Sequence, residues 1–389
     1  MPSHPNIPAN VLPQLDDNDT LDWNSLLHRQ SAPADPAALA EPFTGRRILI
    51  TGAAGSIGSA LAKSIACFHP ERLILLDSAE HGLYELQIQL QALPFIVRFA
   101  TIPGSVCDAP LVREILGTHH PHVVYHAAAY KHVPLMERHP LAAIQNNTLG
   151  TYTIAQACVA AGIPKLILLS TDKAVAPSSI MGAAKRLAEL AVLALNSNNT
   201  QTKALRLGNV LGSRGSVVPL FRSQIESGGP ITVTHPQVSR YFLPLRESIE
   251  RLLALAQLRY TSGIFIPRID HPILIMDLAD FLIKNFAADA EIPITFTGLR
   301  SGDKMHEALL APGESVVESI DKSSNQEPLL HIQSPQPPPD LIFSALQEMK
   351  EAIQQRNHAR ALEILQTLLP DYHPSDLVRR HVATSVSTL

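Results

Sequence analysis

Two stretches of the chain carry residue types that could transfer protons. In the first, the apolar run Leu166–Leu169 ends in Ser170-Thr171-Asp172-Lys173, the pattern of a buried parallel strand that delivers polar residues to a site. In the second, Met181 and Lys185 are four residues apart, on one face of an expected helix. A carboxylate beside an amine, with a second amine on a helix, can do acid–base chemistry. A solvated charge pair on an ordinary strand–loop–helix has the same pattern.

The composition is that of an ordinary soluble protein. The 389 residues are 46% hydrophobic and 17% charged, and the formal net charge of −4 gives no basic excess that would indicate nucleic acid. The three cysteines, Cys67, Cys107 and Cys158, have no metal-ligand spacing, and the histidines form no metal signature. No apolar run approaches the roughly 20 residues that span a membrane, and we see no signal-peptide core. We therefore expect a cytoplasmic protein with no metal and no transmembrane segment.

Strands and helices alternate over residues 45–211. Arg47–Thr51 is a short apolar strand that runs into a glycine turn and a helix, and Arg72–Leu76 is a second strand that ends in Asp77. The further expected elements are helices over Tyr84–Leu90, Pro110–Gly117, Leu141–Ala161 and Gly182–Leu195, and strands over Ile96–Ile102, Val123–His126 and Lys203–Leu207. This alternation predicts an α/β fold, a doubly wound parallel sheet of the Rossmann type, with its ligand at the C-terminal ends of the strands.

The flanking regions differ from this core. Residues 1–44 hold several prolines and predict an extended arm with a short helix near Trp23–His28. We expect residues 212–311 to form a smaller substrate-binding region interleaved with the first domain, residues 312–340 a polar linker, and residues 341–389 a helical tail. The elements expected there are a strand at Pro230–Thr234 and helices at Arg246–Leu258, Met276–Ala287, Leu341–Arg356 and Ala359–Leu369.

The glycine turn after the first strand predicts a dinucleotide site. Gly52 permits the tight turn, Gly55 lets the backbone approach a pyrophosphate, and Gly58 lets helix and strand pack closely. The residues that complete this cofactor-binding turn are Ala54, Ser56 and Ile57, at a helix N-terminus that favours phosphate. Asp77 is expected to accept hydrogen bonds from the adenosine ribose and to repel a 2′-phosphate, which favours NAD over NADP. A strand-end turn residue is the alternative reading of Asp77.

The glycine spacing with a later helical lysine resembles the extended short-chain dehydrogenase/reductase superfamily. A closer resemblance, over about residues 45–310, is to the CapD-like polysaccharide biosynthesis family of UDP-N-acetylglucosamine 4,6-dehydratases. The stretches that carry it are Val123–Pro140, Ser170–Val175, Met181–Arg186, Arg206–Phe221, Pro230–Phe242 and Phe296–Glu307. The resemblance implies an enzyme that removes water from a UDP-N-acetylhexosamine, with NAD as a recycled hydride carrier, to supply polysaccharide synthesis.

The resemblance also implies roles for the residues at the centre of the site. Lys173 would remove the C5 proton, Asp172 would protonate the departing C6 hydroxyl, and Thr171 would bond the 4-hydroxyl. Lys185 would stay charged and hold the nicotinamide ribose. The superfamily usually has a tyrosine base where this chain has Met181, whose thioether has no exchangeable proton, but methionine there resembles an active branch of these dehydratases. For Lys173 to act as a base, its pKa must fall.

The same motifs imply further contacts. Ala127 and Ala128 would let the cofactor approach the backbone, Ser105 and Val106 would lie at the adenine, and Asn147 resembles an inward-facing asparagine of the superfamily. The residues expected at the UDP-sugar are Lys131, His132, Glu137, Asn209, Arg214, Ser216, Val217, Arg240 and Arg300. The arginines suit a diphosphate, because their planar fork matches phosphate oxygens, and Arg300 is the strongest candidate. Surface salt bridges are the alternative for all three.

Two other functions stay open. A UDP-sugar 4-epimerase shares the fold and the oxidation at C4, but it has no leaving hydroxyl to protonate, so the Asp172-Lys173 pair favours dehydration. A non-catalytic NAD-binding scaffold is favoured only by Met181. We expect a homo-oligomer, with the helices over residues 141–161 and 182–195 as the candidates for pairing subunits, as in relatives.

Overall fold

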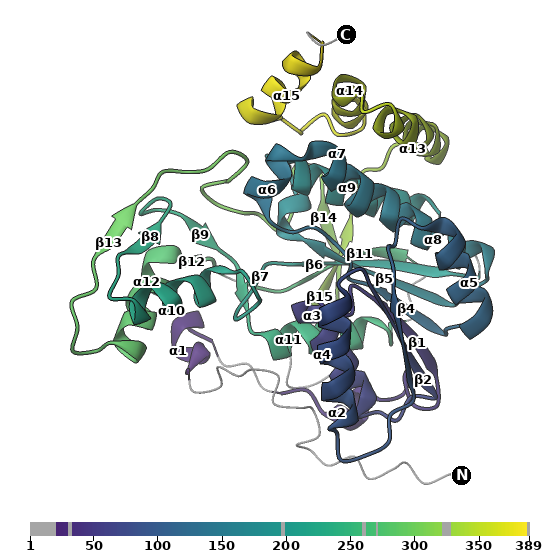
Figure 1. Ribbon diagram of the computed structural model, residues 1–389, viewed down its shortest axis with the longest axis horizontal. Coiled ribbons are helices and arrows are strands. Elements are labelled where there is room, and N and C mark those ends of the chain that lie inside the picture. Colours follow the sequence, from purple (N-terminus) through teal and green to yellow (C-terminus); the bar gives the residue numbers. More distant parts are fainter. Residues whose placement is uncertain are drawn as a thin grey trace.

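A single twisted sheet forms the centre of the molecule (Figure 1). The computed structural model describes residues 21–29, 33–195, 199–258, 262–269, 271–320 and 328–386. The strands of the sheet are β1 (Arg47–Thr51), β2 (Arg72–Asp77), β3 (Phe99–Pro103), β4 (Val123–His126), β5 (Lys165–Thr171), β6 (Gln201–Leu207), β11 (Ser262–Pro267), β14 (Ser315–Ile320) and β15 (Leu329–Gln333). They lie in the order β14-β15-β11-β6-β5-β4-β1-β2-β3, and β14 and β15 are antiparallel additions to a parallel sheet. The predicted doubly wound fold is confirmed.

Helices cover both faces of this sheet (Figure 1). On one face lie α3 (Ser56–Ala66), α4 (Glu80–Gln91) and α11 (Leu245–Leu255), and on the other α5 (Ala109–His119), α8 (Thr151–Ala160) and α9 (Ile180–Ala194). In β1, Ile48 and Ile50 pack toward the first face while Leu49 packs toward the second, as alternating side chains of a strand must. Both faces are therefore buried, which explains why the strands read as continuous apolar runs.

The helix expected over Leu141–Ala161 is divided into three pieces. α7 (Pro140–Ile144) passes into a π-helix, η1 (Gln145–Gly150), and then into α8. Within η1 the Thr148 hydroxyl donates to the Ala184 carbonyl of α9 at 2.8 Å. Such π-bulges occur most often at functional sites.

A smaller region lies beside the sheet (Figure 1). Its elements are β7 (Asn209–Val210), α10 (Val217–Glu226), β8 (Ile231–Val233), β9 (Ser239–Arg240), β10 (Phe242–Leu243), β12 (Ile273–Leu274), α12 (Ile275–Phe286) and β13 (Ile294–Phe296). The arm contributes α1 (Trp23–Leu27) and α2 (Pro36–Leu39), so the helix expected near Trp23–His28 is confirmed. Trp23 packs on Phe281 of α12, with ring centroids 5.6 Å apart. Residues 1–20 and 30–32 of the arm lie outside the described residues.

The expectation of a polar loop over residues 312–340 is wrong. This segment contains β14 and β15, which extend the main sheet beyond β11. It is also fixed by what we call the buried arginine cluster, formed by Arg206, Glu189 and Glu314 with Ser170, Arg186 and Ser334. Arg206 pairs with Glu189 at 2.9 Å and with Glu314 at 2.6 Å, and its side chain is fully buried. An ion pair between distant segments thus joins the supposed linker to the core.

The helical tail packs on the molecule instead of projecting from it (Figure 1). It comprises the expected hairpin, α13 (Pro339–Gln354) and α14 (His358–Leu368), and a further helix, α15 (Asp376–Val386). Buried residues of the hairpin such as Leu346 and Leu365 join Leu187 and Leu190 of α9 in one apolar cluster. The tail therefore covers part of the α9 surface that we expected to pair subunits.

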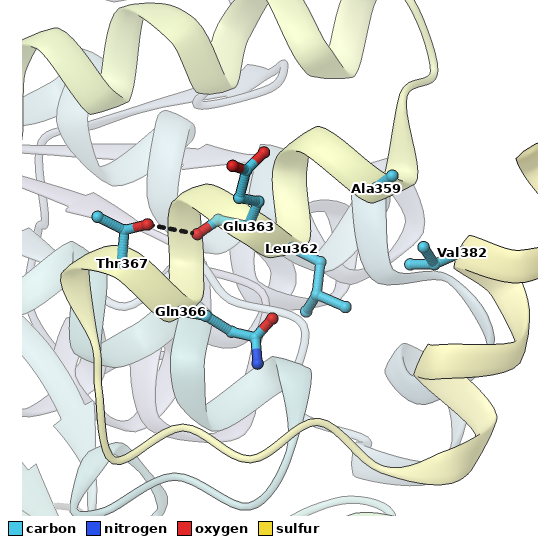
Figure 2. Close-up of a pocket in the computed structure, with 6 residues that line it drawn as sticks. All are labelled: Ala359, Leu362, Glu363, Gln366, Thr367 and Val382. Carbon is cyan, nitrogen blue, oxygen red and sulfur yellow. Dashed lines mark hydrogen bonds between the residues drawn. The ribbon is translucent and has the colours of Figure 1, made fainter.

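The outer side of the tail carries a shallow pocket between α14 and α15 (Figure 2). Leu362 and Val382 supply its apolar lining, and Thr367 donates a hydrogen bond to the Glu363 carbonyl within it. None of the residues predicted for the active site lines it. Within the described ranges, no helix has both the length and the apolar character required to cross a bilayer.

Candidate active site

The glycine turn lies between β1 and α3 and has the close packing that only glycine permits. Gly52 has a φ of +68°, and a Cβ added there would lie 2.5 Å from the Ala128 nitrogen. A Cβ on Gly58 would lie 2.0 Å from the Gly52 carbonyl oxygen. Gly55 is the N-cap of α3 and makes no side-chain cap, so the first-turn N–H groups of Ser56 and Ile57 stay directed at whatever occupies the turn.

Asp77 lies at the end of β2, next to this turn. Its carboxylate accepts hydrogen bonds from the Ala54 N–H and the Ala79 N–H, each at 2.9 Å. Asp77 therefore acts as a strand-end turn residue, because its carboxylate fixes the backbone of the glycine turn. Each oxygen keeps a second lone pair, so a ribose hydroxyl can also donate to it.

The third wall of the turn comes from the end of β4. The Ala127 N–H donates to the Thr51 carbonyl at 3.1 Å, which brings the Ala127–Ala128 backbone against Gly52. Asn147, in the π-helix, holds the following loop by bonding both the N–H and the carbonyl of Tyr130, at 2.8 and 2.9 Å. Val106 is buried against Gly150, while Ser105 is exposed and accepts from the Cys107 N–H at 3.2 Å.

A buried chain of hydrogen bonds at the end of β4 was not predicted from the sequence. His126, the last residue of β4, contacts Thr51 through Nδ1 at 2.6 Å and Thr151 through Nε2 at 2.8 Å. Burial, with a further contribution from Lys185, lowers the pKa of His126 to about 3, so the ring is neutral. A histidine that ends an apolar strand was the only signal in the sequence.

The predicted acid–base residues converge just past β5. Lys173 donates to Asp172 Oδ1 at 3.0 Å and to Asn209 Oδ1 at 3.1 Å, and the Thr171 hydroxyl donates to the same Asp172 oxygen at 2.8 Å. Asp172 is fully buried, and its Oδ2 has no hydrogen-bond partner among the residues that the structure describes. A buried carboxylate oxygen without a donor is costly, so this atom marks the place where a ligand hydroxyl can donate.

The charge of Lys173 is the reverse of what we expected. Burial alone would lower its pKa, but the carboxylates of Asp172 and Glu307 outweigh burial, and the pKa is raised above its ordinary value. Lys173 therefore rests as an ammonium ion. The base that the sequence suggested must be formed by moving its proton to a neighbour.

Glu307 and Lys304 complete what we call the acid–base cluster: Asp172, Lys173, Glu307, Arg240 and Lys304. Glu307 Oε1 lies 3.8 Å from Lys173 Nζ, and its Oε2 lies 3.5 Å from Lys304 Nζ. Glu307 lies in the last motif of the resemblance, but sequence reasoning gave it no role. Glu307 is far from Lys173 in the sequence, so no local sequence pattern could indicate that the two residues are close in the fold.

Lys185 and Met181 lie on the same helix but in different surroundings. Lys185 donates to the Leu169 carbonyl of β5 at 2.7 Å. Burial lowers the pKa of Lys185 to about 8, against the opposing effect of Glu189. Met181 is buried in the apolar cluster that α9 forms with α6 (Val133–Arg138), α7 and the tail.

Glu137, expected at the sugar, contacts the start of α9 and the tail. One oxygen of its fully buried carboxylate accepts from the Ile180 N–H at 2.7 Å, at the start of α9, and the other accepts from the Ser375 hydroxyl of the tail. Burial raises the pKa of Glu137 against the effect of these bonds. Because both oxygens have protein donors, the geometry favours a structural position over the expected sugar contact.

The loop before α10 closes over the glycine turn. The Arg214 N–H donates to the Ser56 hydroxyl at 3.0 Å, Lys131 donates to the Arg214 carbonyl at 2.6 Å, and the His132 ring packs on Gly215. The Arg214 guanidinium is exposed and lies 3.7 Å from Glu85 of α4. This location is at odds with the expected role of Arg214 at the sugar diphosphate.

The start of α10 and two arginines remain as candidates for the nucleotide-sugar. Ser216 is the N-cap residue before Val217, and its buried hydroxyl has no hydrogen-bond partner in the described part of the chain. Arg240 is largely buried and donates to the carbonyls of Ser239, Met305 and Lys304. Arg300 is exposed and pairs with Asp303 at 2.8 Å, so the strongest arginine candidate from the sequence is engaged within its own turn.

A glycine turn after β1 and a polar end of β5, at one edge of a doubly wound sheet, are typical of the extended short-chain dehydrogenase/reductase class. The family described as "Polysaccharide biosynthesis protein" matches residues 48–326, and the chain belongs to this family.

Three curated relatives and one solved structure illustrate the relationship. The capsular polysaccharide biosynthesis protein CapD of Staphylococcus aureus is 40% identical over 316 residues, which are 80% of this chain and 53% of that protein. A UDP-N-acetylglucosamine 4,6-dehydratase (inverting) of Campylobacter jejuni is 31% identical over 70% of this chain and 80% of its own. A UDP-glucose 4-epimerase of Rickettsia rickettsii is 33% identical over the same shares. The X-ray structure of Pen from Bacillus thuringiensis superposes with a TM-score of 0.67 at 26% identity, covering 75% of this chain and 88% of that one. The chain spans about half the length of the CapD relative.

Proposed function

We propose that this protein is a nucleotide-sugar 4,6-dehydratase that acts on a UDP-N-acetylhexosamine, UDP-N-acetylglucosamine above all, with NAD as a recycled cofactor. The observation that carries the proposal is the Asp172 carboxylate, whose buried Oδ2 has no hydrogen-bond partner among the described residues while its Oδ1 accepts from Lys173 at 3.0 Å. A group that must give a proton to a departing hydroxyl needs one free oxygen facing that hydroxyl. The related dehydratase at 31% identity supports the same chemistry.

The residues at the glycine turn fit a dinucleotide. Gly52 and Gly55 carry no side chain and pack against backbone atoms, the first turn of α3 offers N–H groups, and Asp77 is fixed beside them. Ser56 and Lys185 would hold the phosphate and ribose ends, and NADP is disfavoured by the Asp77 carboxylate. When bound, NAD would supply a hydride acceptor for the sugar C4 and return that hydride to C6.

The Asp172–Lys173 pair can supply the proton transfers with one shared proton. Movement of that proton from Lys173 to Asp172, across 3.0 Å, makes the neutral amine and the protonated carboxyl that the elimination needs. Lys173 then takes the C5 proton of the 4-keto sugar, and Asp172 gives its proton to the C6 oxygen, which leaves as water.

The protons balance over the cycle. Lys173 returns its proton to C5 when the hydride reaches C6. The proton lost from the 4-hydroxyl at the oxidation step leaves to solvent, because Lys173 must stay neutral and Asp172 already carries the shared proton. After Asp172 has protonated the departing oxygen and Lys173 has returned its proton to C5, one proton from solvent restores the Lys173 ammonium, so the pair ends as it began. Thr171, which donates to Asp172, is placed to orient the carboxyl.

A 4-epimerase is the second candidate, supported by the relative at 33% identity. Incubation with UDP-N-acetylglucosamine and NAD in D₂O, followed by ¹H NMR, distinguishes the candidates. We expect a 4-keto-6-deoxy sugar that carries deuterium at C5. A C4 epimer with an intact C6 hydroxyl would establish the epimerase instead, and an unchanged sugar with bound NAD would indicate a scaffold.

A further inference from the structure

Glu307 is the second carboxylate near the Lys173 amine, besides Asp172. Its side chain is only 3% exposed, and its Oε1 lies 3.8 Å from Lys173 Nζ and 3.9 Å from Arg240 Nε. The Lys173 ammonium therefore lies within 4 Å of two carboxylates that come from distant parts of the chain. One follows β5 directly, and the other follows the smaller region.

The backbone around Glu307 is fixed from two directions. On one side, Ser239 of β9 bonds the His306 ring through its hydroxyl at 2.9 Å and the Met305 carbonyl through its N–H at 3.1 Å. On the other side, Lys304 donates to the Val175 carbonyl at 2.6 Å, in the loop that follows Lys173. Glu307 is thus carried by a segment that is joined to the loop of the acid–base pair.

None of the cation contacts of Glu307 is a short hydrogen bond. Its Oε2 is buried and has no hydrogen-bond partner among the described residues, although Lys304 Nζ lies 3.5 Å away. A carboxylate held at this range acts on Lys173 mainly through its charge, and a negative charge within about 4–6 Å favours the ammonium form. A role confined to packing would not require a charge, which is costly to bury.

We propose that Glu307 is a positioning residue that, together with Asp172, holds the Lys173 amine between two negative charges and sets the pH at which this amine can serve as a base. The proposal rests on the proposed dehydratase function. The groups that face Lys173 are Asp172, Glu307 and Arg240, and the raised pKa of Lys173 reflects the two carboxylates outweighing both burial and the arginine.

The test compares Glu307→Gln, which keeps the shape but removes the charge, with Glu307→Asp, which keeps the charge. Glu363→Gln, an exposed site on α14, controls for the change in net charge. Reductive methylation with ¹³C-formaldehyde followed by NMR titration reports the charge of each lysine, and Lys173→Arg assigns the signal of Lys173. We expect the Lys173 signal to titrate at lower pH in Glu307→Gln, and to stay near the wild-type position in Glu307→Asp and Glu363→Gln.

The rate of deuterium incorporation at C5 gives the second readout. Because the elimination needs the one proton that Asp172 and Lys173 share, loss of this proton from Lys173 sets the alkaline limb of the pH profile, and this limb should move to lower pH in Glu307→Gln and not in the two other variants. If Glu307→Gln does not fold, Glu307→Ala, which leaves no buried amide, is expected to shift both readouts in the same direction. Unchanged titration of Lys173 without the Glu307 charge would overturn the proposal. Failure of the wild type to make a keto sugar would instead count against the dehydratase function, since the lysine titration needs no substrate.

Discussion

Two buried charge clusters meet at the end of β5, where Ser170 lies in the strand and Asp172 directly follows it, and the two clusters are built in opposite ways. In the buried arginine cluster, each Glu189 oxygen accepts two hydrogen bonds, from Arg206 and either Ser170 or Arg186. Each Glu314 oxygen also accepts two. In the acid–base cluster, one oxygen of Asp172 and one of Glu307 are buried without a hydrogen-bond partner among the described residues.

This difference in hydrogen bonding indicates that the arginine cluster stabilises the fold and that the acid–base cluster is the one that can bind a ligand. A fully bonded cluster has no capacity left for a ligand, so its value lies in fixing β6, α9 and the segment before β14 relative to one another. An incompletely bonded cluster costs stability and persists where a ligand completes it. Because Ser170 belongs to the first cluster and Asp172, two residues further along the chain, to the second, the fully bonded cluster fixes the backbone that leads into the acid–base cluster.

Replacement of Arg206 by methionine should cause the largest loss of stability. Removing one partner of a buried ion pair costs about 3–5 kcal/mol, and here two carboxylates would lose their partner at once. Urea unfolding measures the change in free energy. Arg360→Met, which breaks an exposed ion pair on the tail, is the matched control and should leave the unfolding midpoint unchanged. A midpoint for Arg206→Met equal to the wild type would show that the cluster is not structural.

Replacement of Lys173 by alanine should act on the reaction and leave the fold intact. A positioned acid–base group contributes about 10²–10⁴-fold to the rate, and we expect a loss of this size together with loss of C5 deuterium exchange. Because Lys173 makes only a few bonds and is partly exposed, the unfolding free energy should change much less than in Arg206→Met. The variant should still bind NAD, which calorimetry can measure. Retained C5 exchange would refute the role of Lys173.

Protonation of Glu189 at low pH should remove the stabilisation that the arginine cluster gives to the fold. Burial opposes the ionised form of Glu189, but Arg206 and Arg186 outweigh it and lower its pKa from 4.5 to about 2. A carboxylate with a lowered pKa stabilises the fold fully above its unfolded pKa and ceases to do so as the pH falls through its folded pKa. The free energy of unfolding should therefore fall between about pH 4.5 and pH 2, and Glu189→Gln should lose that dependence. A wild-type curve with the same slope as Glu189→Gln would contradict the pairing.

The sequence predicted the parts of this comparison that are local. The β1 turn and the polar end of β5 each carry their sequence pattern within a few residues, and both lie where they were expected. The arginine cluster was invisible because Arg206 and Glu314 are 108 residues apart. The strands β14 and β15 were read as a polar linker because β14 is exposed, bulged between Val316 and Glu318, and paired only through its partner strand. Glu307 was overlooked for the same reason as Glu314, since its partner is set by the fold.

Substitutions of Met181 should have the smallest effect on stability and on the rate of C5 exchange. They test whether the first turn of α9 contributes to packing or to the reaction. The side chain is 4% exposed and lies in the apolar cluster with Met136, Leu141 and Leu187, where a thioether packs without transferring protons. Met181→Leu conserves volume, so it should cost less than about 1.5 kcal/mol and leave the rate of C5 exchange unchanged. Met181→Tyr, which adds bulk to the same packed site, should cost about 1–3 kcal/mol. A large loss of exchange in a stably folded Met181→Leu variant would show instead that the methionine acts at the reacting sugar, and the division between packing and chemistry along α9 would have to be redrawn.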